Sequence, residues 1–259
     1  MSHPYGEGHA AACIVQRMIE TPIDARLMRK KMTADVTISA THAQGKQQPP
    51  QSVVILGAGG HARVLIDMLQ ADPGVHIAGL IDADPEKQGT TLAGLEILGD
   101  DSLLESLAQR GNTGVILGFA GLATRQARRQ CAQHITELAL QPITAIHPTA
   151  QVATEAQLGP GTAVMAHAVI QTHAQLGRHV IANTGCIIEH DCRIDDLAHI
   201  APAAVLGGAV HIETEAWVGM GAVVREGVRI GAGAIVGAGA VVIEDVPAGQ
   251  TVMGIPARP

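Results

Sequence analysis

The residues best suited to chemistry lie in one short segment, residues 183–192, where Glu189, His190 and Asp191 follow one another. Histidine, whose ordinary pKa is about 6.5, can accept a proton from a nucleophile near neutral pH. A carboxylate beside it can fix the tautomer of the ring and stabilise the imidazolium. The segment therefore predicts a general base at His190, with Asp191 as the first choice for the orienting carboxylate and Glu189 as the second. On these residues alone, an ordinary polar surface is the simpler interpretation.

The element that must position these residues is a six-residue repeat, which spans residues 146–246. One column, taken at every sixth residue from Ile146 to Val242, contains only branched aliphatic residues apart from Ala182. A second column, four places further on, contains only Ala, Thr, Val and Cys from Ala150 to Val246. A helix repeats every 3.6 residues and a strand every two, so a period of six predicts a β-solenoid. We expect three hexads per coil, with both columns pointing into the core.

The register of the repeat predicts which of the other side chains point into the core and which point outward. It places Cys186 and Cys192 in the small inward column, as core residues, and leaves the predicted base outward. His167, His173 and His179 fall at equivalent points on three different faces, so they cannot converge on a metal within one chain. We expect these histidines at the surface or at a subunit interface, and we expect no metal site. Glycines recur in outward positions, where we expect tight corners to favour a residue without Cβ: Gly159, Gly177, Gly207, Gly219, Gly231 and Gly237.

A small parallel α/β domain is predicted before the repeat. Apolar runs at 53–56, 76–81 and 114–117 indicate strands, and residues 62–69 and 125–140 indicate helices. A glycine-rich turn, Gly57-Ala58-Gly59-Gly60-His61-Ala62, follows the first strand. Asp82 and Gly118 follow the other two. Sheets of this kind bind ligands at the carboxyl ends of their strands, where all three features lie.

The glycine turn fits a loose dinucleotide fingerprint, Gly57-x-Gly59-x-x-Ala62. Backbone N–H groups at the start of a helix suit a phosphate. The domain has only about 90 residues, roughly half of a two-lobed dinucleotide fold, which disfavours a nicotinamide cofactor. A purely structural turn is one alternative. A nucleotide diphosphate that belongs to a substrate fits best.

Composition limits the remaining possibilities. The net charge of −7 and the lack of basic clusters beside aromatic residues argue against nucleic acid as a partner. No apolar run reaches the ~20 residues that a membrane span needs, and the cysteines show no metal spacing, so we expect a reducing, cytoplasmic setting. We expect a disordered tail and linker at 1–51, the α/β domain at 52–142, the solenoid at 143–246 and a C-terminal tail at 247–259.

The two halves together resemble one family. The repeat resembles the left-handed parallel β-helix of hexapeptide-repeat acyltransferases, and residues 53–62 add the strand, glycine turn and helix of one branch. This branch contains the sugar acetyltransferases related to sialic acid O-acetyltransferases and to UDP-4-amino-sugar N-acetyltransferases. The junction at 146–150 and the ending at 252–258 also match. The resemblance implies a homotrimer, acetyl-CoA as donor, active sites between neighbouring β-helices and a nucleotide-sugar acceptor, in bacterial surface-glycan or glycoconjugate biosynthesis.

The resemblance also implies roles for single residues. It implies that His190 and Asp191 are catalytic. It also implies that four residues contact acetyl-CoA: His199, Gly208, Met220 and Ala238. The residues that it implies for binding the nucleotide-sugar are Gly59, Gly60, His61, Asp82, Gly118 and Asn183. Many relatives have two consecutive acids where this chain has Asp82-Ala83, which leaves the nucleotide open.

His199 follows His190 by half a coil, so the two should face differently within one chain, and a trimer could bring His199 to a neighbour's site. Two other functions fit the same residues: O-acetylation of sialic acid or another free sugar, and a non-catalytic trimer that binds sugar nucleotides. The adjacent His190 and Asp191 disfavour the non-catalytic trimer.

Overall fold

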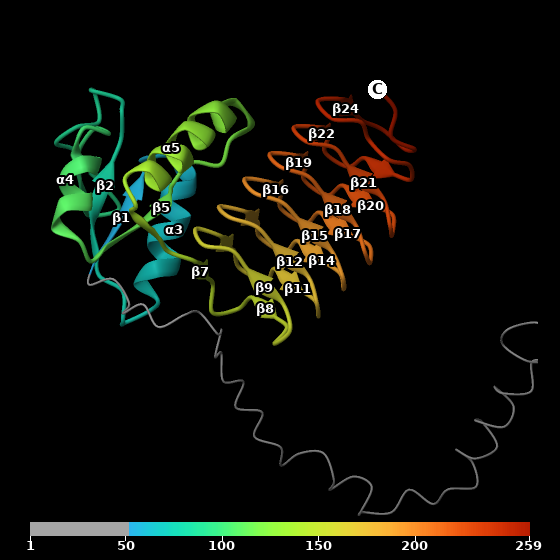
Figure 1. Cartoon of the computed structure of the whole chain (residues 1–259), viewed down its shortest axis with the longest axis horizontal. Helices are drawn as coiled ribbons and strands as arrows, with labels where there is room; N and C mark the ends of the chain where they lie inside the picture. The colour runs from blue at the N-terminus through green and yellow to red at the C-terminus, as the bar shows by residue number, and fades with distance from the viewer. Residues whose placement is uncertain (1–51) are drawn as a thin grey trace, which may run out of the picture. The chain divides into compact units, whose positions relative to one another are not determined.

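The computed structural model describes residues 52–259, which form an α/β domain followed by a left-handed parallel β-helix (Figure 1). The expected tail at 1–51 lies outside the described residues. Within 52–259, no helix has the length and apolar character that crossing a membrane requires.

The α/β domain is built on a six-stranded sheet in the order β3-β4-β2-β1-β5-β6. All its strand pairs are parallel except β3 with β4. The strands are β1 (Ser52–Leu56), β2 (Ile77–Ile81), β3 (Thr91–Leu92), β4 (Leu95–Gly99), β5 (Thr113–Leu117) and β6 (Gln141–Pro142). The helices are α3 (Gly60–Gln70), α4 (Leu103–Arg110) and α5 (Arg125–Glu137), with a short 3-10 helix, η1 (Leu122–Thr124).

Alternation along β1 explains the layers. Val53 and Ile55 pack with the buried face of α3, whereas Val54 and Leu56 pack with α4 and α5 on the other side. Both faces of β1 are therefore covered, as expected for a parallel sheet. The three predicted strands and both predicted helices are confirmed with shifts of a few residues at their ends. The β3–β4 pair and α4 were not predicted.

The β-helix has three sheets, one on each face. Sheet I consists of β7 (Ala145–Ile146), β10 (Ala163–Val164), β13 (Ile181–Ala182), β16 (His199–Ile200), β19 (Trp217–Val218), β22 (Ile235–Val236) and β24 (Thr251–Val252). Sheet II consists of β8 (Gln151–Val152), β11 (Val169–Ile170), β14 (Ile187–Ile188), β17 (Val205–Leu206), β20 (Val223–Val224) and β23 (Val241–Val242). Sheet III consists of β9 (Gln157–Leu158), β12 (Gln175–Leu176), β15 (Arg193–Ile194), β18 (His211–Ile212) and β21 (Arg229–Ile230).

Each coil contains three hexads, as predicted, because Ala163 pairs with Ile181, eighteen residues on. We name the corners by the sheets they join: I–II, II–III and III–I. The expected C-terminal tail adds a strand, since β24 pairs with β22 and extends sheet I.

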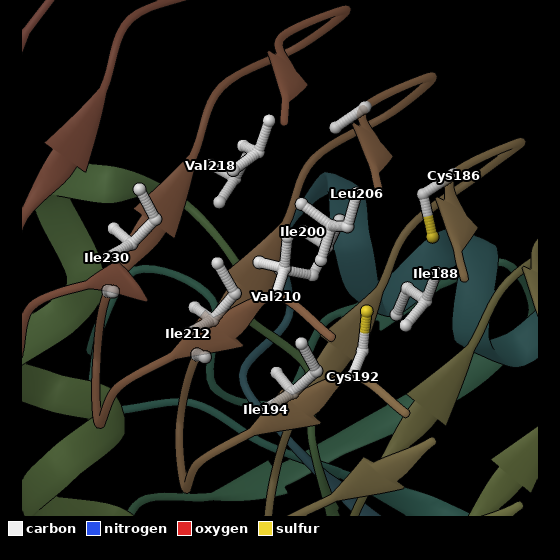
Figure 2. Packing of buried hydrophobic residues seen from close by; sticks show 14 of the residues in the cluster. Cys186, Ile188, Cys192, Ile194, Ile200, Leu206, Val210, Ile212, Val218 and Ile230 are labelled. Carbon is white, nitrogen blue, oxygen red and sulfur yellow. The ribbon is translucent and has the colours of Figure 1, made fainter. Parts of the chain in front are cut away.

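The two inward columns form the core of the β-helix (Figure 2). Cys186 and Cys192 are fully buried within it, and burial raises the pKa of these thiols to about 12 and about 11. Their predicted place in the core is confirmed. At the first coil the column is open to solvent, because Ile146 lies at the end of the stack and is 37% exposed.

The corners repeat a left-handed residue every six positions. His167, His173, His179 and Asp191 have φ of 58°, 60°, 54° and 59°, and Gly161 and Gly185 occupy the same position. The outward glycines have a different purpose from the one we expected. Gly159 does not have positive φ, but a Cβ there would lie 2.4 Å from the backbone of Gly177 in the next coil. These glycines therefore permit the close approach of neighbouring coils.

Candidate active site

His190 and Asp191 form a hydrogen-bonded pair at corner II–III. His190 Nδ1 lies 2.8 Å from Asp191 Oδ2, and both side chains are 57% exposed. A carboxylate can only accept, so the proton of the neutral ring lies on Nδ1 and the lone pair of Nε2 is free. Among the described residues, Asp191 rather than Glu189 makes this hydrogen bond. The pair can therefore act as an oriented general base.

Gly208 lies beside the ring of His190, one coil further on. A Cβ at Gly208 would come within 2.6 Å of His190 Cε1 and 2.7 Å of Nε2. The Ala209 N–H also donates to the His190 carbonyl, at 2.9 Å. Gly208 was predicted to line the acetyl-CoA groove together with Met220 and Ala238. The structure places it against the imidazole of His190 and not among the residues of the pocket that contains those two.

A pocket of about 480 Å³ lies between the α/β domain and sheet I. The α/β domain contributes residues of α3 and of the segment that leads into η1, and the β-helix contributes sheet I and corner I–II. Six residues with predicted ligand contacts meet in this pocket: Gly60, His61, Asn183, His199, Met220 and Ala238. Residues expected to bind the nucleotide-sugar and residues expected to bind acetyl-CoA therefore line one cavity.

His199 is buried in this pocket, 3% exposed, and it faces away from His190, as expected from the register. The Thr184 N–H donates to Asn183 Oδ1 at 2.8 Å, which turns Asn183 Nδ2 toward His199 Nε2, 3.0 Å away. Nε2 must then accept, so the ring proton lies on Nδ1. The ring packs on Trp217 with centroids 4.1 Å apart. Asn183 and Trp217 together fix the tautomer and the orientation of this imidazole.

The two histidines of the pocket are neutral. Burial, and then the charge of Arg128, lowers the pKa of His61 to about 4. Burial, followed by Arg128 and His61, lowers the pKa of His199 to about 3. His61 Nε2 and His199 Nδ1 are buried and have no hydrogen-bond partner within residues 52–259. They can serve a bound ligand, because buried polar atoms are normally paired.

The glycine turn is braced by Asp82. Its carboxylate accepts from the N–H of Ala58 at 2.7 Å, the N–H of Asp84 at 2.9 Å and Lys87 Nζ at 3.1 Å. Burial alone would raise the pKa of Asp82, but these hydrogen bonds together hold it below its ordinary value. Asp82 was predicted to contact the substrate. In the structure its carboxylate holds the shape of the glycine turn, and its contact with the substrate stays a prediction.

The predicted glycines divide into two kinds. A Cβ at Gly59 or Gly60 would meet nothing within 4 Å, so open space lies where a phosphate could approach the start of α3. A Cβ at Gly118 would lie 2.6 Å from the Gly57 carbonyl oxygen. Gly118 therefore allows β1 and β5 to pack closely at this end of the sheet.

The remaining histidines do not assemble a metal site. Across residues 52–259, no cluster of three or more His, Cys, Asp or Glu side chains could hold a metal ion. His167 and His173 are exposed. His179 was expected at the surface or at a subunit interface, and that expectation is wrong, because α5 covers it and leaves it 3% exposed.

Two features of the site were missed in the sequence. Trp217 lines the pocket, and it could have been found because it is the one aromatic residue within the repeat. An outward aliphatic column on sheet II could have been found at a period of eighteen. It consists of Val169, Ile187, Val205, Val223 and Val241.

Comparisons with known proteins agree with this architecture. The model of the PglD N-terminal domain matches residues 52–135, and the model of the bacterial transferase hexapeptide (six repeats) matches residues 209–244. A search of curated proteins found no match.

Several solved structures are similar over most of the chain. Perosamine N-acetyltransferase from Caulobacter crescentus, a histidine-to-asparagine variant in complex with CoA and GDP-perosamine, is 37% identical with a TM-score of 0.74, covering 80% of this chain and 95% of that one. The acetyltransferase domain of PglB from Neisseria gonorrhoeae FA1090, in complex with acetyl coenzyme A, is 35% identical with a TM-score of 0.73, covering 81% and 99%. WeeI from Acinetobacter baumannii AYE is 28% identical with a TM-score of 0.71, covering 80% and 98%. The chain therefore belongs to the hexapeptide-repeat sugar acetyltransferases with a PglD-type N-terminal domain, and it is an acyltransferase.

Proposed function

We propose that the chain transfers the acetyl group of acetyl-CoA to an amino group of a nucleotide-linked sugar, with His190 as general base. The observation that carries this proposal is the His190–Asp191 pair, which leaves Nε2 free to accept a proton. The relatives that are 35–37% identical include an N-acetyltransferase in complex with CoA and GDP-perosamine. The proposal includes a cytoplasmic setting, where acetyl-CoA and nucleotide-sugars are made.

The two substrates divide between the domains. Gly59 and Gly60 would take the diphosphate at the start of α3, where a Cβ at either position would meet nothing within 4 Å. His61 would contact the same ligand. His199, Met220 and Ala238 would line the path of the acyl donor, since all three belong to the β-helix side of the pocket.

The reaction needs one proton acceptor. The sugar amine attacks the carbonyl carbon of the thioester, the N–C bond forms and the C–S bond breaks. The amine proton passes to His190 Nε2 and then to the departing sulfur, which leaves as the thiol of CoA. Asp191 holds the proton on Nδ1 throughout and stabilises the imidazolium, as carboxylates do for catalytic histidines.

A homotrimer completes the proposed site. His190 is more than half exposed at corner II–III, beside the outward aliphatic column of sheet II, and Val223 in that column is 41% exposed. An outward apolar column of this kind supports an interface with another chain. In a trimer of the kind that the family implies, sheet II would pack on a neighbour, and His190 would face the pocket of an adjacent chain.

The test begins with a thermal-shift screen of GDP-, UDP-, dTDP- and CMP-linked amino sugars, followed by a thiol-release assay with acetyl-CoA. We expect turnover with at least one of them, and His190→Ala should lower kcat by about 10²–10⁴ because a positioned base is lost. His76→Ala removes another exposed histidine, far along the sequence in the α/β domain, and should leave kcat unchanged. Full activity of His190→Ala would overturn the assignment of the base. Binding without turnover by the wild-type protein would favour the non-catalytic trimer.

A further inference from the structure

Arg128 is a buried cation that forms no ion pair with a carboxylate of residues 52–259, although the charge of Glu215 partly offsets the lowering of its pKa by burial. It lies on α5, is 2% exposed, and belongs to none of the ion pairs found within residues 52–259. Its guanidinium instead donates to two backbone carbonyls of the β-helix: Nη2 to His179 O at 2.7 Å and Nη1 to Leu197 O at 3.2 Å. Burying a charge is costly unless hydrogen bonds or an opposite charge compensate it. The two hydrogen bonds to the β-helix carbonyls are therefore needed to keep Arg128 buried.

The two carbonyls belong to successive coils at corner III–I. His179 and Leu197 are eighteen residues apart, and both are left-handed corner residues, with φ of 54° and 62°. The Leu197 N–H also donates to the Arg178 carbonyl, at 2.8 Å, which ties the two corners together. The planar fork of an arginine can reach both carbonyls at once, whereas a lysine offers a single nitrogen.

Neighbouring arginines of α5 reach further coils of the same corner. Arg129 makes a two-pronged ion pair with Glu215, and Arg125 Nη2 donates to Gly233 O at 3.2 Å. The arginines of α5 together contact four successive coils at corner III–I, through His179, Leu197, Glu215 and Gly233, and these contacts align the helix with the stack.

This alignment determines the pocket. His61 belongs to α3 and His199 to sheet I, so the distance between them depends on how the α/β domain sits on the β-helix. We propose that Arg128 is a positioning residue for acetyl transfer: its fork on the His179 and Leu197 carbonyls holds the glycine turn and His61 opposite His199. This role rests on the proposed function, because it concerns the meeting of the two substrates.

Electrostatics agree with this placement. The charge of Arg128 contributes to the lowered pKa of both His61, on α3, and His199, on sheet I. Its Nε has no hydrogen-bond partner within residues 52–259, like His61 Nε2 and His199 Nδ1. Three buried polar atoms without a partner therefore come from both domains: Arg128 and His61 from the α/β domain and His199 from the β-helix.

The expected consequence is a change in kcat with little change in KM. The acceptor would be held by the α/β domain and the donor by the β-helix, so each still binds its own partner when the domains shift. The kcat of acetyl transfer falls, because a misplacement of the reacting groups by about 1 Å can lower the rate about 10²-fold. A residue that only stabilised the fold would lower the amount of folded protein and leave kcat per folded site unchanged.

The experiment compares Arg128→Lys with Arg129→Lys, the same chemical change at adjacent positions of α5. With the nucleotide-sugar that the wild-type protein uses, and below the Tm of each variant, Arg128→Lys should lower kcat at least tenfold with the KM for acetyl-CoA within threefold. Arg129 is exposed and its pair with Glu215 survives in Arg129→Lys, so that variant should remain within twofold in both. Unchanged kcat in Arg128→Lys, or a loss that tracks the folded fraction, would overturn the proposal.

Trp217 gives a second readout that needs no turnover. It is the single tryptophan of the chain and packs on His199 in the pocket. Acrylamide should quench its fluorescence more strongly in Arg128→Lys than in the wild-type protein or in Arg129→Lys, because a shifted domain opens the pocket. Equal quenching in all three would overturn the positioning role. If the wild-type protein turns over no nucleotide-sugar, the proposed function fails, and the quenching comparison still decides the role of Arg128.

Discussion

The orientation of the proposed base, His190, depends on the absence of a side chain at Gly208. The backbone there does not have positive φ, so an alanine suits the chain, but its Cβ would lie 2.6 Å from the imidazole of His190. Because His190 is 57% exposed, its ring can rotate away at little cost in stability. Gly208→Ala should therefore lower kcat by about 10²-fold while the free energy of unfolding stays constant or rises by about 0.4–1 kcal/mol.

Steady-state kinetics and thermal denaturation check this prediction together. Gly74→Ala is the matched control, because Gly74 also lacks positive φ and lies outside every predicted site. It should leave kcat unchanged. A fully active Gly208→Ala protein would mean that His190 does not need its present orientation for the reaction.

Single residues were predictable where the repeat or the resemblance reached them. The register placed His190 and Asp191 outward, and the resemblance gave them a role. The stacking of Gly208 on His190 could have been predicted from the same register, because the two residues lie eighteen apart and eighteen residues make one coil; the resemblance assigned Gly208 to acetyl-CoA instead. The engagement of Asp82 with Ala58 could not be predicted, because Ala58 lies at the end of another strand.

Sheet II is the element whose outer surface we expect a second chain to cover. Its outward column stacks five branched aliphatic residues, with Val205 paired between Ile187 and Val223. A charge in the middle of a buried apolar interface is strongly destabilising. Val205→Glu should dissociate the proposed trimer into chains of 26.7 kDa, and acetyl transfer should fall at least tenfold, because the site lies between chains.

Light scattering coupled to size-exclusion chromatography measures this change, and circular dichroism reports whether the chain stays folded. Gln175→Glu supplies the control, since it places the same side chain at an outward position of sheet III. It should leave the mass unaltered. A trimeric and active Val205→Glu protein would remove sheet II from the interface, and a monomeric wild-type protein would refute the trimer itself.

Elements were predictable to the extent that their environment repeats. Every hexad meets the same surroundings in the coil above and below, so two columns sufficed to predict three sheets in register. The β3–β4 pair and α4 have no such repetition; β3 is only two residues long and α4 has two buried residues, Leu104 and Leu107. The burial of His179 depends on α5, far away in sequence, and the period of six could not reveal it.

At the scale of the whole molecule, buried neutral histidines make the free energy of unfolding depend on pH. His61, His179 and His199 lie where the α/β domain meets the β-helix, and burial is the main cause of their lowered pKa values of about 4, about 4 and about 3. The charge of Arg128 lowers all three, and Arg178 also acts on His179, where Asp196 opposes it. In the unfolded chain each would titrate near its ordinary value of about 6.5.

The sign of the effect follows from proton binding. Between about pH 6.5 and pH 4 the unfolded chain takes up protons that the folded protein excludes, so stability is complete above pH 6.5 and falls with acidification. Each imidazole should cost about 2 kcal/mol between pH 7 and pH 5. Thermal denaturation across this range should show a steep fall in Tm, and His179→Gln, which cannot be protonated, should make the slope shallower. A Tm that stays constant from pH 7 to pH 5 would contradict the burial of neutral imidazoles between the two domains.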